Sequence, residues 1–445
     1  MKTARLAALI ISGGLCSATQ AVAQTTPGTG DASTPAATQP APTPTPPPAV
    51  TPPPPPPPAA PSDDENLFRF YGTLNPRIIV ADGAVESFNQ PNASAITAAG
   101  NPAYANAPDR SRHTFQVAQS RVGFWLNEKG PLRAQLEIDF VDFTKATPTV
   151  ASLPRLRLVH VDYTFHPGHT VSLGQDWDLH APLNPHGINL VGALFQAGNS
   201  AFMRQQLKYF YSKPSFELGV AVGFPAPNVT AKDAAFEIGA LPTFAVRGTY
   251  KFGKSRVGAS ALATRIPFNF GAADERYAAA FAAALFTELA PSDNTNIRVE
   301  LNYGQNSANL GLLTLAQGRA SDDVQELGGY ISVRQVLTGM HAVYGMAGYQ
   351  KVLEPSKVVP SYAYAATTGD ALPALGSATL SGTGPGLLHN GTVRLGYELK
   401  PSRRLAFVLE GFLFQSHFRQ QAVDVGRFEA ERTALGIETG AILSF

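Results

Sequence analysis

The stretch that decides the fold is Leu132-Arg133-Ala134-Gln135-Leu136-Glu137-Ile138-Asp139-Phe140. Every second residue in it is apolar, and each residue between is charged or carries an amide. A period of two predicts a β-strand with one apolar face and one wet face. The same period returns at residues 244–252, 296–303 and 392–399. In this register Leu136, Val299 and Leu395 face outward, and Glu137, Arg298 and Arg394 face inward.

The connections between such segments alternate in length. Short ones are expected at residues 127–130, 166–168, 213–214, 253–254, 290–294, 338–339 and 400–403. Long ones are expected at 81–113, 144–154, 177–204, 224–242, 266–277, 305–324, 353–388 and 417–429. Short turns that alternate with long loops are typical of outer-membrane barrels. The predicted fold class is therefore all-β: a transmembrane antiparallel β-barrel of about sixteen strands, wide enough for an aqueous lumen.

A barrel is also the membrane fold that the rest of the sequence permits. After Glu65 no apolar run approaches the roughly 20 residues that a spanning helix needs, and a closed barrel is the other fold that satisfies every backbone group in lipid. Two segments are ambiguous. The alanine-rich residues 277–288 could form a helix, and residues 155–165 go out of phase at Arg157-Leu158, which allows a β-bulge.

The N-terminal segment has the form of a secretory signal peptide. Lys2 and Arg5 precede an apolar run at residues 6–15, and small residues follow up to Ala23. We expect cleavage after Ala23, which makes residues 1–23 the signal peptide. Cleavage also removes Cys16, the single cysteine of the sequence, and a thiol-free mature chain suits an oxidising periplasm. Export combined with a barrel predicts the bacterial outer membrane.

Residues 24–65 differ in composition from the rest of the chain. They are dominated by Pro, Ala and Thr and include an unbroken proline run at residues 52–58. Because proline lacks an amide donor, we expect a disordered, extended periplasmic segment there, acting as a spacer or as a tether to the cell wall. The barrel domain is then residues 66–445.

The overall charge is close to balanced. Lys and Arg number 34 against 33 Asp and Glu, a formal net charge of +1. A chain of this charge lacks the broad basic field that attracts nucleic acid, so no nucleic-acid partner is expected.

Four short motifs carry a family resemblance: AQSRVGF at residues 118–124, GPLRAQLEIDF at 130–140, RLRLVHVDY at 155–163 and LGQDW at 173–177. With these motifs, and with a terminal Phe445 shared by porins at large, the chain resembles the DcaP-like trimeric porins of bacteria. The resemblance implies a sixteen-stranded barrel, a homotrimer and a third extracellular loop folded into the lumen. Some relatives carry a helical, coiled-coil-like segment before the barrel, which the proline run forbids here.

Charged residues on the wet face are the candidate pore-lining and constriction residues. With the loop residues after LGQDW, they are Arg77, Arg121, Arg133, Glu137, Asp139, Arg157, Asp176, Asp178, His180, Asn184, His186, Arg298, Arg334 and Arg394. Arginine stays charged at physiological pH and forks onto carboxylates and phosphates, so an arginine row favours anionic solutes. The alternative is a mutually paired wall with little net preference.

The loop at residues 176–202 is the expected constriction. If it folds inward, its polar residues face Arg77, Arg121, Arg133 and Arg157, and the pore narrows between opposite charges. The alternative is a disordered surface loop.

The predicted function is a water-filled channel for passive diffusion of small hydrophilic solutes, with a preference for anions. The alternatives are a structural anchor that reaches the cell wall through the proline-rich segment, and an outer-membrane hydrolase. No catalytic constellation is readable, and no cofactor or metal site is predicted. The turn His166-Pro167-Gly168-His169 offers two imidazoles without a third ligand. The expected partners are outer-membrane lipid, two further copies of the chain, and the solutes.

Overall fold

The computed structural model describes residues 67–82, 85–87, 90–93, 111–141, 154–190, 192–224, 241–268, 276–310, 312, 315, 323–357, 361–362, 387–422 and 426–445. The chain divides into two units, residues 1–60 and 61–445, and all of the described residues belong to the second. The predicted signal peptide and proline-rich segment lie outside the described residues. Among the described residues, no helix is long and apolar enough to cross a membrane.

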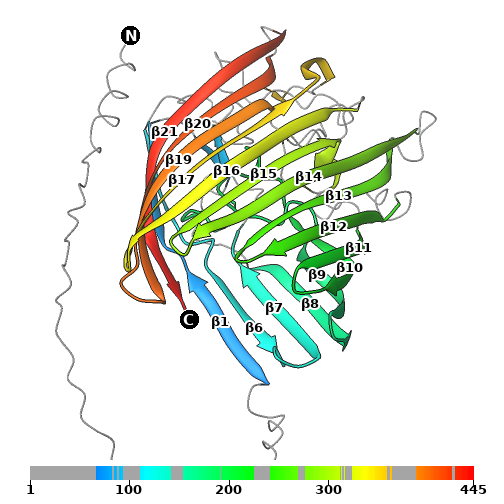
Figure 1. Cartoon of the computed structure of the whole chain (residues 1–445). Coiled ribbons are helices and arrows are strands. Elements are labelled where there is room, and N and C mark those ends of the chain that lie inside the picture. The colour runs from blue at the N-terminus through cyan, green and yellow to red at the C-terminus, as the bar shows by residue number, and fades with distance from the viewer. Residues whose placement is uncertain are drawn as a thin grey trace, which may run out of the picture. The chain divides into compact units, whose positions relative to one another are not determined.

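Most β-strands of the second unit follow one another around one sheet (Figure 1), and two short strands, Val85–Ser87 and Gln90–Ala93, pair in a separate sheet. The strands are β1 (Phe68–Leu74), β2 (Arg77–Ala81), β3 (Val85–Ser87), β4 (Gln90–Ala93), β5 (Arg112–Gln116), β6 (Arg121–Leu126), β7 (Leu132–Asp139), β8 (Arg155–His166), β9 (His169–Trp177), β10 (Met203–Ser212), β11 (Phe216–Gly223), β12 (Thr243–Phe252), β13 (Ser255–Phe268), β14 (Arg276–Ser292), β15 (Thr295–Gln305), β16 (Gln325–Thr338), β17 (His341–Val352), β18 (Ser361–Tyr362), β19 (Leu387–Leu399), β20 (Leu405–Ala422) and β21 (Gly426–Ser444). Two short 3-10 helices are described, at Ser307–Leu310 and Pro355–Lys357.

The sheet closes because the last strand pairs with the first. β21 runs antiparallel to both β1 and β2, which are two parts of one strand. β5 and β6 are likewise two parts of the next strand, since they pair with β2 and β1 in turn. β18 adds only a short parallel pairing to β20, so the barrel has 16 strands, as predicted. A closed sheet leaves no unpaired edge, which is what lipid requires of a spanning sheet.

The two faces of the strands separate as the alternation predicted. On β7 the carboxylates of Glu137 and Asp139 are buried inside the barrel, with Glu137 only 3% exposed. On β19 the outward side chain of Leu395 is 62% exposed, whereas inward Arg394 is 3% exposed. Large apolar side chains project outward from nearly every strand. Moving each of them from water into an apolar medium is worth about 1.5–3 kcal/mol, so the bilayer itself stabilises the barrel.

The short connections lie where the sequence predicted them. β8 and β9 are joined through Gly168, whose φ of 81° is a left-handed conformation that a glycine adopts without strain. β12 and β13 are joined in the same way at Gly253, with a φ of 57°. All the short turns share one end of the barrel.

The ambiguous segments are settled in favour of strands. Residues 277–288 lie within β14, which pairs along its length with β13 and β15, so the helical alternative is wrong. Alanine does not oppose this, because its small side chain fits the inward face beneath the loop. β8 contains the β-bulge: Glu137 lies opposite Leu158 and Ile138 opposite Leu156, which leaves Arg157 as the extra residue.

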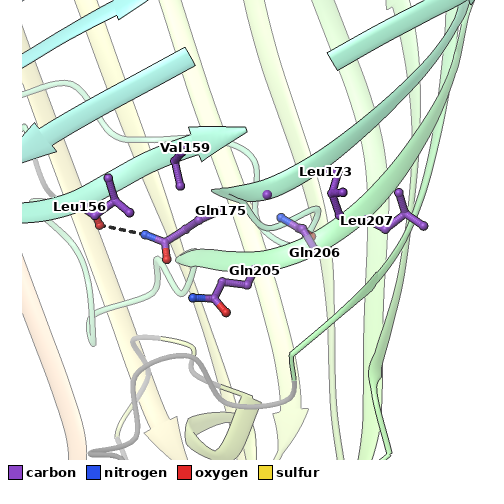
Figure 2. A pocket seen from close by; sticks show the side chains of 8 residues that line it. Leu156, Val159, Leu173, Gln175, Gln205, Gln206 and Leu207 are labelled. Atoms are coloured by element: carbon purple, nitrogen blue, oxygen red, sulfur yellow. Dashed lines mark hydrogen bonds between the residues drawn. The ribbon is translucent and has the colours of Figure 1, made fainter. Parts of the chain in front are cut away.

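Above the bulge, β8 and β9 separate. Their pairing ends at Val159 and Gln175, and the side-chain amide of Gln175 donates to the carbonyl oxygens of Leu156 and Arg157 at 2.9 and 3.0 Å. This amide lines an outward-facing hollow of about 460 Å³. Figure 2 shows it pointing to Leu156. The amide thus replaces strand hydrogen bonds on the lipid side.

One predicted connection is wrong. Residues 417–429 were expected to form a long loop, but β20 continues to Ala422 and β21 begins at Gly426. On β20 the described outward residues beyond Leu413, which are Gln415 and His417, are polar, because the strand extends past the apolar band. The loss of alternation therefore marks the edge of the membrane zone, not the end of the strands.

Candidate functional site: a loop inside the barrel

The segment between β9 and β10, residues 178–202, lies inside the barrel. On one side the Asn75 amide donates to the carbonyl of Ile188 at 3.1 Å, beside the junction of β1 and β2. Far around the sheet, the Asn302 amide of β15 donates to the carbonyl of Gly198 at 2.7 Å. A segment that contacts well-separated strands around a closed sheet must lie in the lumen. The predicted inward fold of the third long loop is therefore observed.

An apolar contact holds the loop against one part of the wall. Leu183, Ile188 and Leu194 of the loop are almost fully buried. They pack on inward-facing side chains of β14, β16, β17 and β20, namely Phe286, Tyr330, Tyr344, Met346 and Val408. Each buried leucine or isoleucine contributes about 1.5–3 kcal/mol, enough to keep the loop in place. An apolar patch on an otherwise wet inner face is thus explained by the loop that covers it.

Glycine allows the loop backbone to approach the wall closely. A Cβ at Gly348 of β17 would lie 2.0 Å from the carbonyl oxygen of Ala197. A Cβ at Gly198 of the loop would lie 2.1 Å from the carbonyl oxygen of Gly329 on β16, and Gly198 has a φ of 103°. Any residue other than glycine at either position would therefore displace the backbone.

Asp178 is anchored by Arg204, which was not among the predicted site residues. The Arg204 Nε donates to the Asp178 carboxylate at 2.6 Å, and both side chains are almost fully buried. Arg204 also donates to the carbonyl oxygens of Phe224 and Leu310. The expectation that Asp178 faces Arg77, Arg121, Arg133 or Arg157 is wrong, because Arg204 at the start of β10 lies closer to the loop's point of departure.

The two loop histidines face different surroundings. The His180 Nε2 lies 3.1 Å from the Ser200 hydroxyl, within the loop itself. The His186 Nε2–H donates to the Asn296 side-chain oxygen at 2.9 Å, and its Nδ1 lies 2.8 Å from the Ser332 hydroxyl. Burial lowers the pKa of His180 to about 4. Burial, aided by the Arg298 charge, lowers the pKa of His186 to about 4. Both imidazoles are therefore neutral at neutral pH.

Arg298 also contacts the loop. Its Nη1 donates to the carbonyl oxygen of Asn184 at 2.8 Å, and its Nε donates to the Glu288 carboxylate at the same distance. The Asn184 side chain is exposed. His186 and Asn184 thus meet β15 and β16, across the lumen from the early-strand arginines that were expected to face them.

The early-strand arginines pair mostly with acids of their own wall. Arg157 contacts both Glu137 and Asp139, and its guanidinium lies 5.1 Å from the centre of the Trp177 ring. Arg155 donates to Asp139 at 2.6 Å. Arg121 lies 3.8 Å from Glu137 and reaches the loop at the carbonyl of Leu190, 3.3 Å away. Two carboxylates therefore serve three guanidinium groups in this cluster.

A second network joins strands at the closure of the barrel. Arg77 pairs with Glu438, and Arg394 pairs with Glu410 and lies 3.3 Å from Glu438. The Tyr344 hydroxyl donates to Glu410 at 2.6 Å. All five groups are nearly inaccessible in the described structure, so they fix strands to one another.

The remaining predicted residues lie in smaller pairs on the inner face. Arg133 donates to Asp162 at 3.0 Å, Arg334 donates to Glu398 at 2.9 Å, and Asp176 pairs with Lys208. Four residues of these pairs were not among the predicted ones: Asp162, Lys208, Glu410 and Arg155. Each stands on the wet side of a strand that alternates, so cross-strand register was the signal that could have found them.

Comparison with known proteins identifies solved structures that have a similar fold. No protein-family model matches the sequence, and no curated protein matches it. Among solved structures, the outer membrane channel DcaP of Acinetobacter baumannii matches with a TM-score of 0.61 and 12% identity, over 85% of this chain and 97% of that chain. The chain has the porin fold.

The porin fold is also shared with the anion-selective porin from Comamonas acidovorans. That structure matches with a TM-score of 0.50 and 13% identity, over 85% of this chain and 99% of the other. Identity this low carries the fold and no individual residue. The roles of this chain's lumen residues therefore have to be argued from its own contacts.

Proposed function

We propose that the chain is an outer-membrane porin through which small hydrophilic solutes diffuse passively, with a preference for anions. The observation that carries the channel function is the closed 16-stranded barrel with a polar inner face and an inserted loop. A barrel of this strand number leaves room for water where an eight-stranded one is filled by side chains. The loop reduces that room to a filter. We expect no catalytic activity, because the Ser200 hydroxyl and the His180 imidazole that pair within the loop are each only 1% exposed and are closed off from solutes in the lumen.

The anion preference rests on which partner of each pair faces the lumen water. The side chain of Arg133 is 39% exposed and its partner Asp162 is 8% exposed. Arg256 is 38% exposed over Glu288 at 15%, and Arg334 is 28% exposed over Glu398 at 17%. The guanidinium groups lie toward the water and the carboxylates lie beneath them, so a passing ion meets positive charge first.

The numbers of cationic and acidic side chains within two clusters also support a preference for anions. Glu288 is shared by Arg256 and Arg298, and Glu217 is shared by Arg247 and Lys251. Each of these clusters therefore carries an excess positive charge. In two pairs, Lys208 with Asp176 and Arg247 with Glu217, the acid is the more exposed partner.

Planar-bilayer recording tests the channel and its selectivity together. The purified full chain should give stable conductance steps, and the reversal potential in a potassium chloride gradient should have the sign of an anion-selective pore. Replacing Arg256 and Arg298 by glutamine should shift the reversal potential toward cations. Lys254→Gln is the matched control, because Lys254 pairs with Asp293 on an exposed turn.

The possible results separate the two parts of the proposal. Absence of conductance steps in a folded, inserted protein would contradict the channel. A native channel that selects cations, or an Arg256 and Arg298 double variant with an unmoved reversal potential, would contradict the role of these arginines and leave the channel standing.

Export and assembly complete the proposal. We propose cleavage after Ala23, residues 24–65 as a periplasmic segment able to contact the cell wall, and a homotrimer in the membrane. The trimer rests on the resemblance of the four sequence motifs. Mass spectrometry of the outer-membrane form should give a mature N-terminus at Gln24, and cross-linking should stop at three chains.

A further inference from the structure

We propose that His389, His417 and Glu431 form a binding site for a divalent transition-metal ion of the zinc class on the outward face of the barrel. A donor atom from each of the three residues lies within 4.8 Å of the other two. In the part of the chain that the structure describes, these residues are the one group of three or more that meets this criterion. None of them belongs to the lumen site.

The strand register builds the cluster. His389 of β19 lies directly opposite His417 of β20, and His417 lies directly opposite Glu431 of β21. Directly opposite residues in antiparallel strands have their Cβ atoms about 4.5–5.5 Å apart and share a face. Three potential ligands therefore stand in one row across three rigid strands, so little conformational freedom is lost when an ion is bound.

The two imidazoles already have the arrangement of neighbouring ligands. The His417 Nδ1 lies 3.0 Å from the His389 Nε2, and the two rings are nearly perpendicular at 83°. At this distance one proton lies between the two nitrogens. A metal ion would take the place of that proton, and binding would release it.

The row faces outward at the boundary of the apolar band. On the same face of these strands, toward the short turns, lie exposed apolar side chains such as Leu395, Leu413 and Leu435. The ring of Tyr349, 47% exposed on β17, lies 5.8 Å from the His389 ring, as expected of an aromatic residue at a membrane interface. The histidines are partly exposed and Glu431 is exposed, so an ion from the surrounding water can reach them.

The donor set selects the class of ion. Two imidazole nitrogens and one carboxylate suit zinc and related ions, which bind nitrogen at about 2.0–2.1 Å. Calcium and magnesium prefer sites made entirely of oxygen. Three protein ligands leave a fourth position for water. A bound ion would join β19, β20 and β21 beyond the membrane, including the strand that closes the barrel.

Zinc binding by the detergent-solubilised full chain tests the site. Isothermal titration calorimetry should give one zinc ion per chain for the native protein and no response to calcium at the same concentration. His389→Ala and His417→Ala should each abolish the zinc response, and Glu431→Gln should weaken zinc affinity at least tenfold. The matched control is His169→Ala, which removes an imidazole from the His166 and His169 pair, whose rings are 5.2 Å apart.

The visible absorption spectrum of bound Co²⁺ tests the site in the native protein. Added to the native protein, Co²⁺ should give the intense visible bands of a four-coordinate site, and zinc should displace them. The spectrum of fully hydrated cobalt, or zinc binding that persists in a folded His389→Ala and His417→Ala double variant, would overturn the proposal.

Discussion

Arg204 holds the start of the lumen loop through a buried ion pair. Its guanidinium is buried with Asp178 at the point where the lumen loop leaves β9. Removing one partner of a buried ion pair leaves an uncompensated charge, which costs about 3–5 kcal/mol. We expect Arg204→Gln to lower the free energy of unfolding by that amount in urea titrations of the detergent-solubilised protein.

The matched control for this prediction is Arg256→Gln. Arg256 is also an inward arginine with a carboxylate partner, but it is much more exposed, so its loss should cost about 1 kcal/mol or less. Adding Asp178→Asn to Arg204→Gln should recover part of the stability. Equal effects of Arg204→Gln and Arg256→Gln would show that the buried pair does not anchor the loop.

The loop histidines predict a pH dependence. Burial holds the pKa of His180 and His186 at about 4 in the folded chain, against about 6.5 in an unfolded one. Between these values the unfolded chain binds more protons, so the free energy of unfolding falls as the pH falls from about 6.5 toward 4. Changing both histidines to glutamine should flatten this slope, measured as the urea midpoint from pH 7.5 to 4.5.

The comparison variant here is His341→Gln, which lies beside a short turn and outside the loop. It should keep the native slope. A double variant at His180 and His186 with an unchanged slope would mean that other groups, such as the lumen carboxylates, set the acid response.

For single residues, the sequence predicts well on which face of a strand a side chain lies. It predicts poorly which other side chain that residue contacts. Alternation placed Glu137 inside and Leu395 outside, because the side-chain period of a strand is two. It could not place Asp178 beside Arg204, since that contact depends on the path of a loop through a lumen made by distant strands. Arg394 was predicted to face water, yet it lies buried between Glu410 and Glu438. Its replacement by leucine would therefore itself be costly.

Among the elements, β8 and its bulge carry a specific stabilising contact. The Gln175 amide satisfies two carbonyl oxygens that the separating strands leave without ladder partners on the lipid-facing side. An unsatisfied buried acceptor costs about 1–3 kcal/mol. Gln175→Leu should lower the free energy of unfolding in lipid vesicles by about that amount, although leucine is the more apolar residue.

The neighbouring Gln205 offers a control for Gln175. It faces the same hollow from β10, and the described residues provide no hydrogen bond to its side chain. Gln205→Leu should therefore be neutral or stabilising in lipid. If both changes stabilise the barrel, the bulge carbonyls must find another donor.

Some boundaries of the strands could be predicted from the sequence and others could not. The bulge was visible as a break in phase at Arg157-Leu158, and the short turns were visible because glycine and polar residues interrupt the apolar period. The true ends of β20 and β21 were invisible. Outside the bilayer a strand no longer needs an apolar face, so its sequence there resembles that of a loop.

For the whole molecule, the outward apolar band predicts how deep each outward residue lies in the bilayer. Arginine substitutions can test these depths. Ile331 and Leu337 both face outward on β16, 47% and 57% exposed, and Leu337 is next to a short turn. An arginine at the bilayer midplane costs about 2–4 kcal/mol, and near the interface about 0–1 kcal/mol. Ile331→Arg should thus reduce the free energy of folding into vesicles far more than Leu337→Arg does. Equal costs would place the membrane band elsewhere on the barrel.

The inserted loop also has a consequence for the order of events in folding. Asn390, which binds the loop at Gln196, is 194 residues further along the chain, and Gly348 and Val408 are likewise late in the sequence. The loop cannot settle until those strands have arrived, and such long-range contacts form slowly. We therefore expect the barrel to close before the loop takes its place in the lumen. Time-resolved refolding should show the barrel's β-sheet signal well before the loop becomes resistant to protease.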